Sequence, residues 1–124
     1  MLLEEDLTGR IIGAAIEVHR NLGPGLLESA YSRCLALEMN TARLNFISEV
    51  VLPITYKGIQ VEPAYRVDFL VEEKIIVEVK AIELLLPIHK AQLLTYLKLS
   101  HRKVGLLINF HSVMLKDGIY RMVL

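Results

Sequence analysis

The sequence lacks disulfide chemistry, a net charge and any long apolar run. Its single cysteine, Cys34, leaves no intrachain disulfide and suits a reducing compartment. Because 14 Lys and Arg residues balance 14 Asp and Glu residues, no basic field attracts a polyanion over long range. No run of about 18 apolar residues occurs, and the acidic start MLLEEDLTGR is unlike a leader. We therefore expect a cytoplasmic protein with no membrane contact and no tight non-specific binding to DNA.

Several common active-site patterns are also missing. The four histidines are scattered and form no metal-binding cluster with the cysteine. A P-loop, a dinucleotide-binding glycine fingerprint and a G-x-S-x-G motif are absent from the sequence as well. What remains is 124 residues with 53% hydrophobic composition, which suits one domain spanning residues 1–124.

Hydrophobic periodicity predicts a mixed α/β fold with helices packed on a central sheet. Helices are expected where apolar residues recur at helical spacing, and strands where β-branched and aromatic residues gather between turn signals. The predicted helices span about residues 4–22, 26–44 and 87–100. The predicted strands span about residues 48–56, 61–71, 75–80, 103–110 and 119–123, the first three forming an antiparallel meander.

Three charged residues lie in the otherwise apolar hairpin YRVDFLVEEKIIVEVKA, residues 65–81. A loop at residues 72–74 would pair Val71 with Ile75, Leu70 with Ile76, Phe69 with Val77, and Asp68 with Glu78. Directly opposite carboxylates repel each other unless a cation lies between them. Because side chains alternate along a strand, Lys80 shares a face with Glu78. One face of the hairpin therefore carries Asp, Glu and Lys together.

Two carboxylates with additional waters suit Mg²⁺, with Mn²⁺ as a substitute, and the carbonyl of Val79 would offer a further oxygen. Such a metal polarises a phosphoryl oxygen and acidifies a bound water. Lys80 would orient or deprotonate that water, or stabilise charge on the pentavalent phosphorus, and the sequence does not separate these roles. The alternative is a metal-free ion pair in which Lys80 neutralises Glu78 or Asp68.

Two helical segments supply further candidates. In GLLESAY, Glu28 and Tyr31 lie three residues apart just after a glycine-rich turn, which would aim the carboxylate at the sheet. Alternatively, Glu28 complements the helix dipole and Tyr31 packs in the core. In HKAQLLTYLK, His89, Gln92 and Tyr96 form a polar stripe. Gln92 would hydrogen-bond a phosphate, a water or a carboxylate, unless the stripe is simply a solvated helix face.

Together these residues resemble the small bacterial and archaeal proteins named for a GxxExxY motif, which belong to the PD-(D/E)XK nuclease-like superfamily. The motif is present as Gly25, Glu28 and Tyr31. The segments AAIEVHRNLGPGLLESAY, YKG, YRVDFLVEEKIIVEVKA, HKAQLLTYLK and GLLINF match the family pattern in order, nearly from end to end.

The resemblance implies a restriction-endonuclease-like αβββαβ core, with a central mixed sheet flanked by helices. It also implies a site made of Glu28, Asp68, Glu78, Lys80 and Gln92, a Mg²⁺ cofactor, and hydrolysis of nucleic acid, with DNA favoured over RNA. Because the neutral chain would hold long duplex weakly, we expect binding to need a homodimer, a protein partner or a short, frayed substrate. The rival hypothesis is a non-catalytic binding or assembly module that keeps the nuclease fold.

Overall fold

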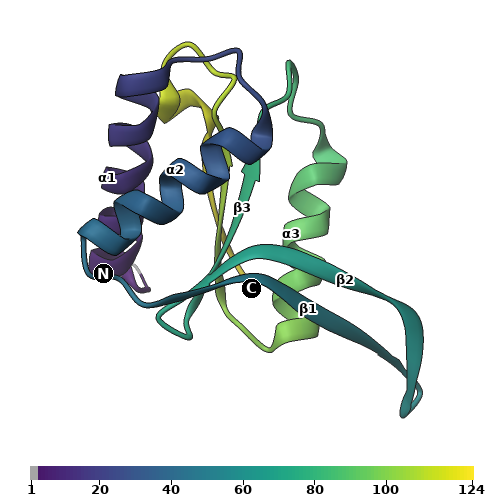
Figure 1. Ribbon diagram of the computed structural model, residues 1–124. Coiled ribbons are helices and arrows are strands. Elements are labelled where there is room, and N and C mark those ends of the chain that lie inside the picture. Colours follow the sequence, from purple (N-terminus) through teal and green to yellow (C-terminus); the bar gives the residue numbers. More distant parts are fainter. Residues whose placement is uncertain (1–2) are drawn as a thin grey trace.

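The computed structural model describes residues 3–124, with helices on both faces of one five-stranded sheet (Figure 1). The helices are α1 (Glu5–Leu22), α2 (Glu28–Thr41) and α3 (Pro87–Ser100). The strands are β1 (Phe46–Tyr56), β2 (Ile59–Val71), β3 (Ile75–Lys80), β4 (Val104–Asn109) and β5 (Ile119–Val123). A single turn of 3-10 helix, η1 (Leu115–Gly118), precedes β5. All three helices and all five strands predicted from the sequence are present.

The sheet is mixed, with strand order β1-β2-β3-β4-β5. The first three strands form the expected antiparallel meander, and β4 pairs antiparallel with β5. Between them, β3 and β4 run parallel. A parallel pair needs a crossover connection, and α3 supplies it. The arrangement confirms the expected αβββαβ core with a mixed sheet flanked by helices.

The two faces of the sheet carry separate apolar cores. One core lies against α1 and α2; its sheet residues include Phe69, Val71, Ile75, Val77, Val79, Leu106 and Ile108. The other lies against α3; it includes Leu52, Val67, Leu70, Ile76, Leu93, Leu97 and Leu107. Because both faces are covered, all six residues of β4 are buried, which agrees with the continuous apolar run in the sequence.

Helix α2 is shorter than the predicted span of 26–44. It begins at Glu28 because the backbone before it is held open: Gly25 has φ 100°, and the N–H of Leu26 donates to the Tyr31 hydroxyl at 3.1 Å. The helix ends at Thr41, and Arg43 takes a left-handed φ of 60° that α-helical geometry does not allow. The two ends therefore depart from the prediction through local backbone geometry.

Strands β1 and β2 begin two residues earlier than predicted and form a long hairpin that extends beyond the helices (Figure 1). Its tip turns at Gly58, where φ is 82°. Tyr56 and Ile59 beside the turn are more than half exposed, because nothing in the described part of the chain covers them.

Among residues 3–124, no helix combines the length and apolarity needed to cross a membrane.

Candidate functional site

The hairpin of β2 and β3 is paired for only part of its length. Three of the predicted cross-strand pairs are present, namely Val71–Ile75, Leu70–Ile76 and Phe69–Val77. The fourth, between Asp68 and Glu78, is not part of the ladder. The predicted cross-strand pairing of Asp68 with Glu78 is therefore wrong, because the β2–β3 ladder ends at the pair Phe69–Val77.

Beyond the Phe69–Val77 pair, side-chain carboxyl groups accept the backbone N–H groups in place of strand carbonyls. The N–H of Asp68 donates to Glu78 Oε1 at 2.8 Å, and the N–H of Val79 donates to Asp68 Oδ2 at 2.7 Å. The crossed bonds hold the two carboxyl groups side by side where the strands part. The same position is irregular toward β1: the ladder passes from Ser48–Phe69 to Val50–Val67, and Glu49 between them has φ 53°.

The carboxyl groups of Asp68 and Glu78 have pKa values that are unusual for a β-hairpin. Glu78 is only 7% exposed. Burial, and next the charge of Asp68, raise the pKa of Glu78 to about 8, against the opposing effects of the Asp68 N–H and of Lys80. Burial likewise raises the pKa of Asp68, while the Val79 N–H and Lys80 lower it. The charged forms of both carboxyl groups are therefore disfavoured in the metal-free protein, mainly because burial removes their water.

Lys80 ends β3 half-buried, two residues after Glu78 on the same side of the strand. Its positive charge lowers the pKa values of Glu28, Asp68 and Glu78, so it is close enough to act on all three. Among the described residues, however, Lys80 forms no ion pair. The bond on which the ion-pair alternative depends is therefore not formed.

The turn before α2, held by hydrogen bonds to Tyr31, positions Glu28 at this site. Gly25 adopts φ 100°, which favours glycine. The buried Tyr31 donates its hydroxyl to the Gly23 carbonyl at 2.6 Å and accepts the Leu26 N–H. Its ring stacks on Phe110 at 4.6 Å. The three positions of the G-x-x-E-x-x-Y segment thus act together: glycine shapes the turn, tyrosine holds it, and glutamate begins α2.

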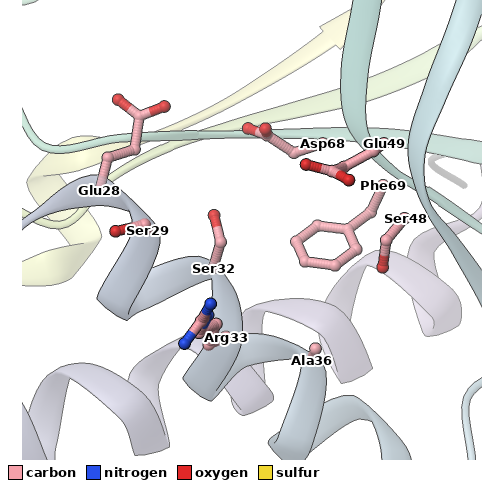
Figure 2. A pocket seen from close by; sticks show the side chains of 9 residues that line it. All are labelled: Glu28, Ser29, Ser32, Arg33, Ala36, Ser48, Glu49, Asp68 and Phe69. Carbon is pink, nitrogen blue, oxygen red and sulfur yellow. The ribbon is translucent and has the colours of Figure 1, made fainter.

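Glu28 lies at the exposed mouth of a cavity of about 600 Å³ between α2 and the strands β1 and β2. Figure 2 shows the carboxylates of Asp68 and Glu49 directed toward the side where Glu28 stands. Partial loss of water raises the pKa of Glu28; Lys80 lowers it and Asp68 raises it. The lining consists of Glu28, Ser29, Ser32, Arg33, Ala36, Ser48, Glu49, Asp68 and Phe69 (Figure 2).

The three candidate residues of α3 lie in different surroundings. Gln92 is exposed, and its amide makes no hydrogen bond within residues 3–124. Tyr96, one turn later, packs half-buried against the α3 core. Burial raises its pKa, and so do the nearby charge of Glu78, then Tyr65 and Asp68. His89 accepts the Leu86 N–H at 2.9 Å and so caps the helix.

Two features of the site were not predicted from the sequence. Glu49 is a lone acid in a β-rich run, and no pattern marks it. Asn109, the last residue of β4, is buried opposite Lys80. It accepts the Ile82 N–H at 3.1 Å and donates to the Ile82 carbonyl at 2.9 Å, which fixes the chain just after Lys80. A polar residue closing an apolar strand was the available signal for Asn109.

The donors present suit a hard divalent cation that retains water. Among residues 3–124, no three Asp, Glu, His or Cys side chains are grouped closely enough to hold a metal by themselves. Asp68 and Glu78 would need a main-chain oxygen and waters in addition, as Mg²⁺ commonly does. Val79 offers that oxygen, because the carbonyl of a strand residue points to the same edge as its N–H, and this N–H points to Asp68.

Comparisons with known proteins give one family. A family model described as PD-(D/E)XK nuclease superfamily matches residues 5–122. No curated protein matches the chain. Among solved structures, the one titled "Crystal structure of SSO0001" is 21% identical with a TM-score of 0.49, over 99% of this chain and 69% of that chain.

Proposed function

The chain belongs to the PD-(D/E)XK nuclease superfamily, and from that premise we propose that it is a Mg²⁺-dependent nuclease, for which Mn²⁺ substitutes. Residues 1–124 form one nuclease domain of the GxxExxY type, which acts on DNA in the cytoplasm of a bacterium or archaeon. Asp68 and Glu78 bind the metal together with the carbonyl of Val79. Lys80 stands at the attacking water, and Glu28 and Gln92 support the metal and the water.

The observation that carries the proposal is the crossed arrangement of Asp68 and Glu78. Two carboxyl groups are held together by backbone N–H groups at the end of a ladder, and burial raises the pKa of both. Such an arrangement is costly unless a cation or a proton compensates the charge. When bound, Mg²⁺ would polarise the phosphoryl oxygen and lower the pKa of a coordinated water.

The protein's own groups account for the remainder of the reaction. In hydrolysis, the water gives up a proton to solvent and its oxygen forms a bond to phosphorus. The bond from phosphorus to the leaving sugar oxygen breaks, and that oxygen takes up a proton from solvent. The Lys80 ammonium would hold the water or a non-bridging oxygen, and either contact would stabilise the negative charge of the transition state. Glu28 approaches from the other side of the opening and would accept a hydrogen bond from the water.

Cleavage assays test the proposal directly. Single- and double-stranded DNA and RNA are incubated with purified protein in Mg²⁺, Mn²⁺ or EDTA. Glu78→Gln is prepared identically, with Glu62→Gln as a control that removes an acid from exposed β2 surface. We expect metal-dependent cleavage by the wild type and by Glu62→Gln, and none by Glu78→Gln. Cutting that persists in EDTA, or in Glu78→Gln, contradicts this site.

The rival function is a non-catalytic module, favoured by the absence of a three-ligand group among residues 3–124. Thermal unfolding separates the two functions, because a ligand that binds only the folded state stabilises it by about 2.7 kcal/mol at 100 times its Kd. A nuclease should gain stability from Mg²⁺, and Asp68→Asn with Glu78→Gln should abolish the gain. A binding module should be indifferent to Mg²⁺.

A further inference from the structure

Two tyrosines form a joined aromatic surface at the boundary of α3 and β2. The rings of Tyr65 and Tyr96 lie 6.0 Å apart between centroids, with an interplanar angle of 41°, within the range of attractive aromatic pairs. Tyr96 is anchored in the α3 core, whereas Tyr65 is 45% exposed. One ring is therefore fixed by packing, and it supports a second ring that is open to a ligand.

This aromatic pair adjoins the carboxylates. Tyr65 lies three residues before Asp68 on β2, at the end where β2 has left β3. Tyr96 packs against the core that contains Leu70 and Ile76, which lie two residues from Asp68 along β2 and from Glu78 along β3. Because α2 covers the opposite face of the sheet from α3 (Figure 1), Glu28 and the two tyrosines approach the carboxylates from opposite sides.

The net charge of the chain limits which form of nucleic acid such a surface would bind. With no net charge, the protein gains little from phosphate contacts alone. Aromatic rings instead gain affinity from bases, at about 1–3 kcal/mol per stacked base, with little regard to sequence. Bases inside a duplex are already stacked on their neighbours and must be extruded before they reach a protein ring.

We propose that Tyr65 and Tyr96 form a stacking platform for an unpaired base next to the phosphate that is cut, so that the substrate is single-stranded or frayed nucleic acid. The proposal rests on the proposed function for the position of that phosphate. Tyr65 makes the direct contact with the base, and Tyr96 positions the ring of Tyr65.

Binding without cleavage tests the platform by itself. In EDTA, Glu78→Gln is titrated with a labelled ten-nucleotide oligo(dT) and with a blunt duplex of the same length. Tyr65→Ala, Tyr65→Phe and Tyr56→Ala are made in that background; Tyr56 is a matched control, since it is 62% exposed at the hairpin tip. Thermal unfolding of each variant confirms that it is folded.

We expect tighter binding of the single strand than of the duplex. Tyr65→Ala should weaken single-strand binding roughly 5- to 150-fold, the range that corresponds to one stacked base. Tyr65→Phe and Tyr56→Ala should bind like the parent. Equal loss in Tyr65→Ala and Tyr56→Ala, no loss in either, or no single-strand binding at all would overturn the platform.

Cleavage assays then separate this inference from the proposed function. Metal-dependent cutting that is equal on duplex and single strand and is unaffected by Tyr65→Ala would leave a nuclease without a platform. Ring-dependent binding of single strands without cleavage under any metal condition would leave a platform on a non-catalytic module.

Discussion

The carboxylates of Asp68 and Glu78 accept backbone N–H groups that would otherwise donate to a neighbouring strand. The choice of substitution therefore decides what an experiment measures. Asn and Gln keep an acceptor oxygen while removing the charge. Alanine would leave a part-buried N–H without its acceptor, at a cost of about 1–3 kcal/mol. Amide substitutions test the chemistry of these residues, and alanine substitutions also test their contribution to folding.

Glu78 should make the stability of the metal-free protein depend on pH. Its pKa rises from 4.5 to about 8 on folding, so the folded state holds a proton that the unfolded state releases. The stabilisation is complete below pH 4.5 and is lost as the pH rises to about 8. Denaturant unfolding in EDTA at pH 6 and pH 9 should show a loss on the order of a few kcal/mol. Glu78→Gln should lose clearly less, and parallel pH curves for the two proteins would refute the assignment.

Lys80→Met should separate catalysis from metal binding. The substitution keeps most of the apolar stem and removes the charge, so turnover should fall by about 10²- to 10⁴-fold while Mg²⁺ still raises the Tm. Lys74→Met in the loop of the same hairpin, whose ammonium lies 3.9 Å from Glu4, serves as the control and should keep both properties. If Lys80 were only an ion-pair partner, its substitution would instead lower stability and leave no selective loss of turnover.

At the scale of residues, the sequence marked the candidates but not their geometry. Alternation along β3 correctly separated Val77 and Val79, which join the α1/α2 core, from Glu78. The break in the ladder at Asp68 was not predictable, because it depends on side chains replacing main-chain partners. Glu49 has no sequence signal; its φ of 53° appears only in the folded backbone.

At the scale of elements, the turn before α2 and the first turn of that helix form one unit. Tyr31 joins them through its two hydrogen bonds to Gly23 and Leu26. The position of Glu28 is therefore set by a side chain that need not touch the substrate.

Tyr31→Phe tests that unit. The ring would still stack on Phe110, but the Leu26 N–H and the Gly23 carbonyl would lose their partner, and stability should fall by about 1–3 kcal/mol. Cleavage should fall as well, because Glu28 loses its fixed approach. Urea unfolding and initial rates below the Tm give the two readouts, with Tyr56→Phe as the control. A normal rate in a destabilised Tyr31→Phe would show that the brace serves only the fold.

The same scale shows why element ends were harder to predict than elements. The helical spacing of apolar residues already begins at Leu26, so the predicted start of α2 is two residues too early. The hydrogen bond to Tyr31 and the φ of Gly25 determine where the helix begins. Strands β1 and β2 extend toward the hairpin turn and the α2 loop by pairs that no apolar pattern requires. The loop at 72–74 was predictable because strong apolar runs border it on both sides.

At the scale of the whole molecule, the mixed sheet and its two flanking layers followed from the order of elements. The balance of charge has a measurable consequence for binding. Arg33 lines the cavity that Asp68 also lines, and Lys80 ends β3. We expect only these two cations to contact phosphate, so few counterions should be released when a single strand binds. With about two phosphate contacts and a slope of about −0.7 per contact, log affinity against log salt should have a slope near −1.4.

This expectation is checked by titrating oligo(dT) into Glu78→Gln between about 50 and 200 mM salt, a range over which affinity depends strongly on the number of phosphate contacts. Arg33→Gln should make the slope shallower by about 0.7, whereas Arg43→Gln in the loop after α2 should leave it unchanged. A slope steeper than about −4 would indicate an extended cationic surface, such as one assembled by a second copy of the chain.

The parallel pairing of β3 with β4 also predicts an order of events during folding. The β2–β3 hairpin closes over a three-residue loop, and contacts so near in sequence form early because little chain entropy is lost. Strand β4 joins only after the chain has crossed through α3, which closes a much longer loop. We therefore expect Asp68 and Glu78 to meet while they are still hydrated. We expect them to lose their water last, when α3 and β4 dock and the raised pKa of Glu78 is established.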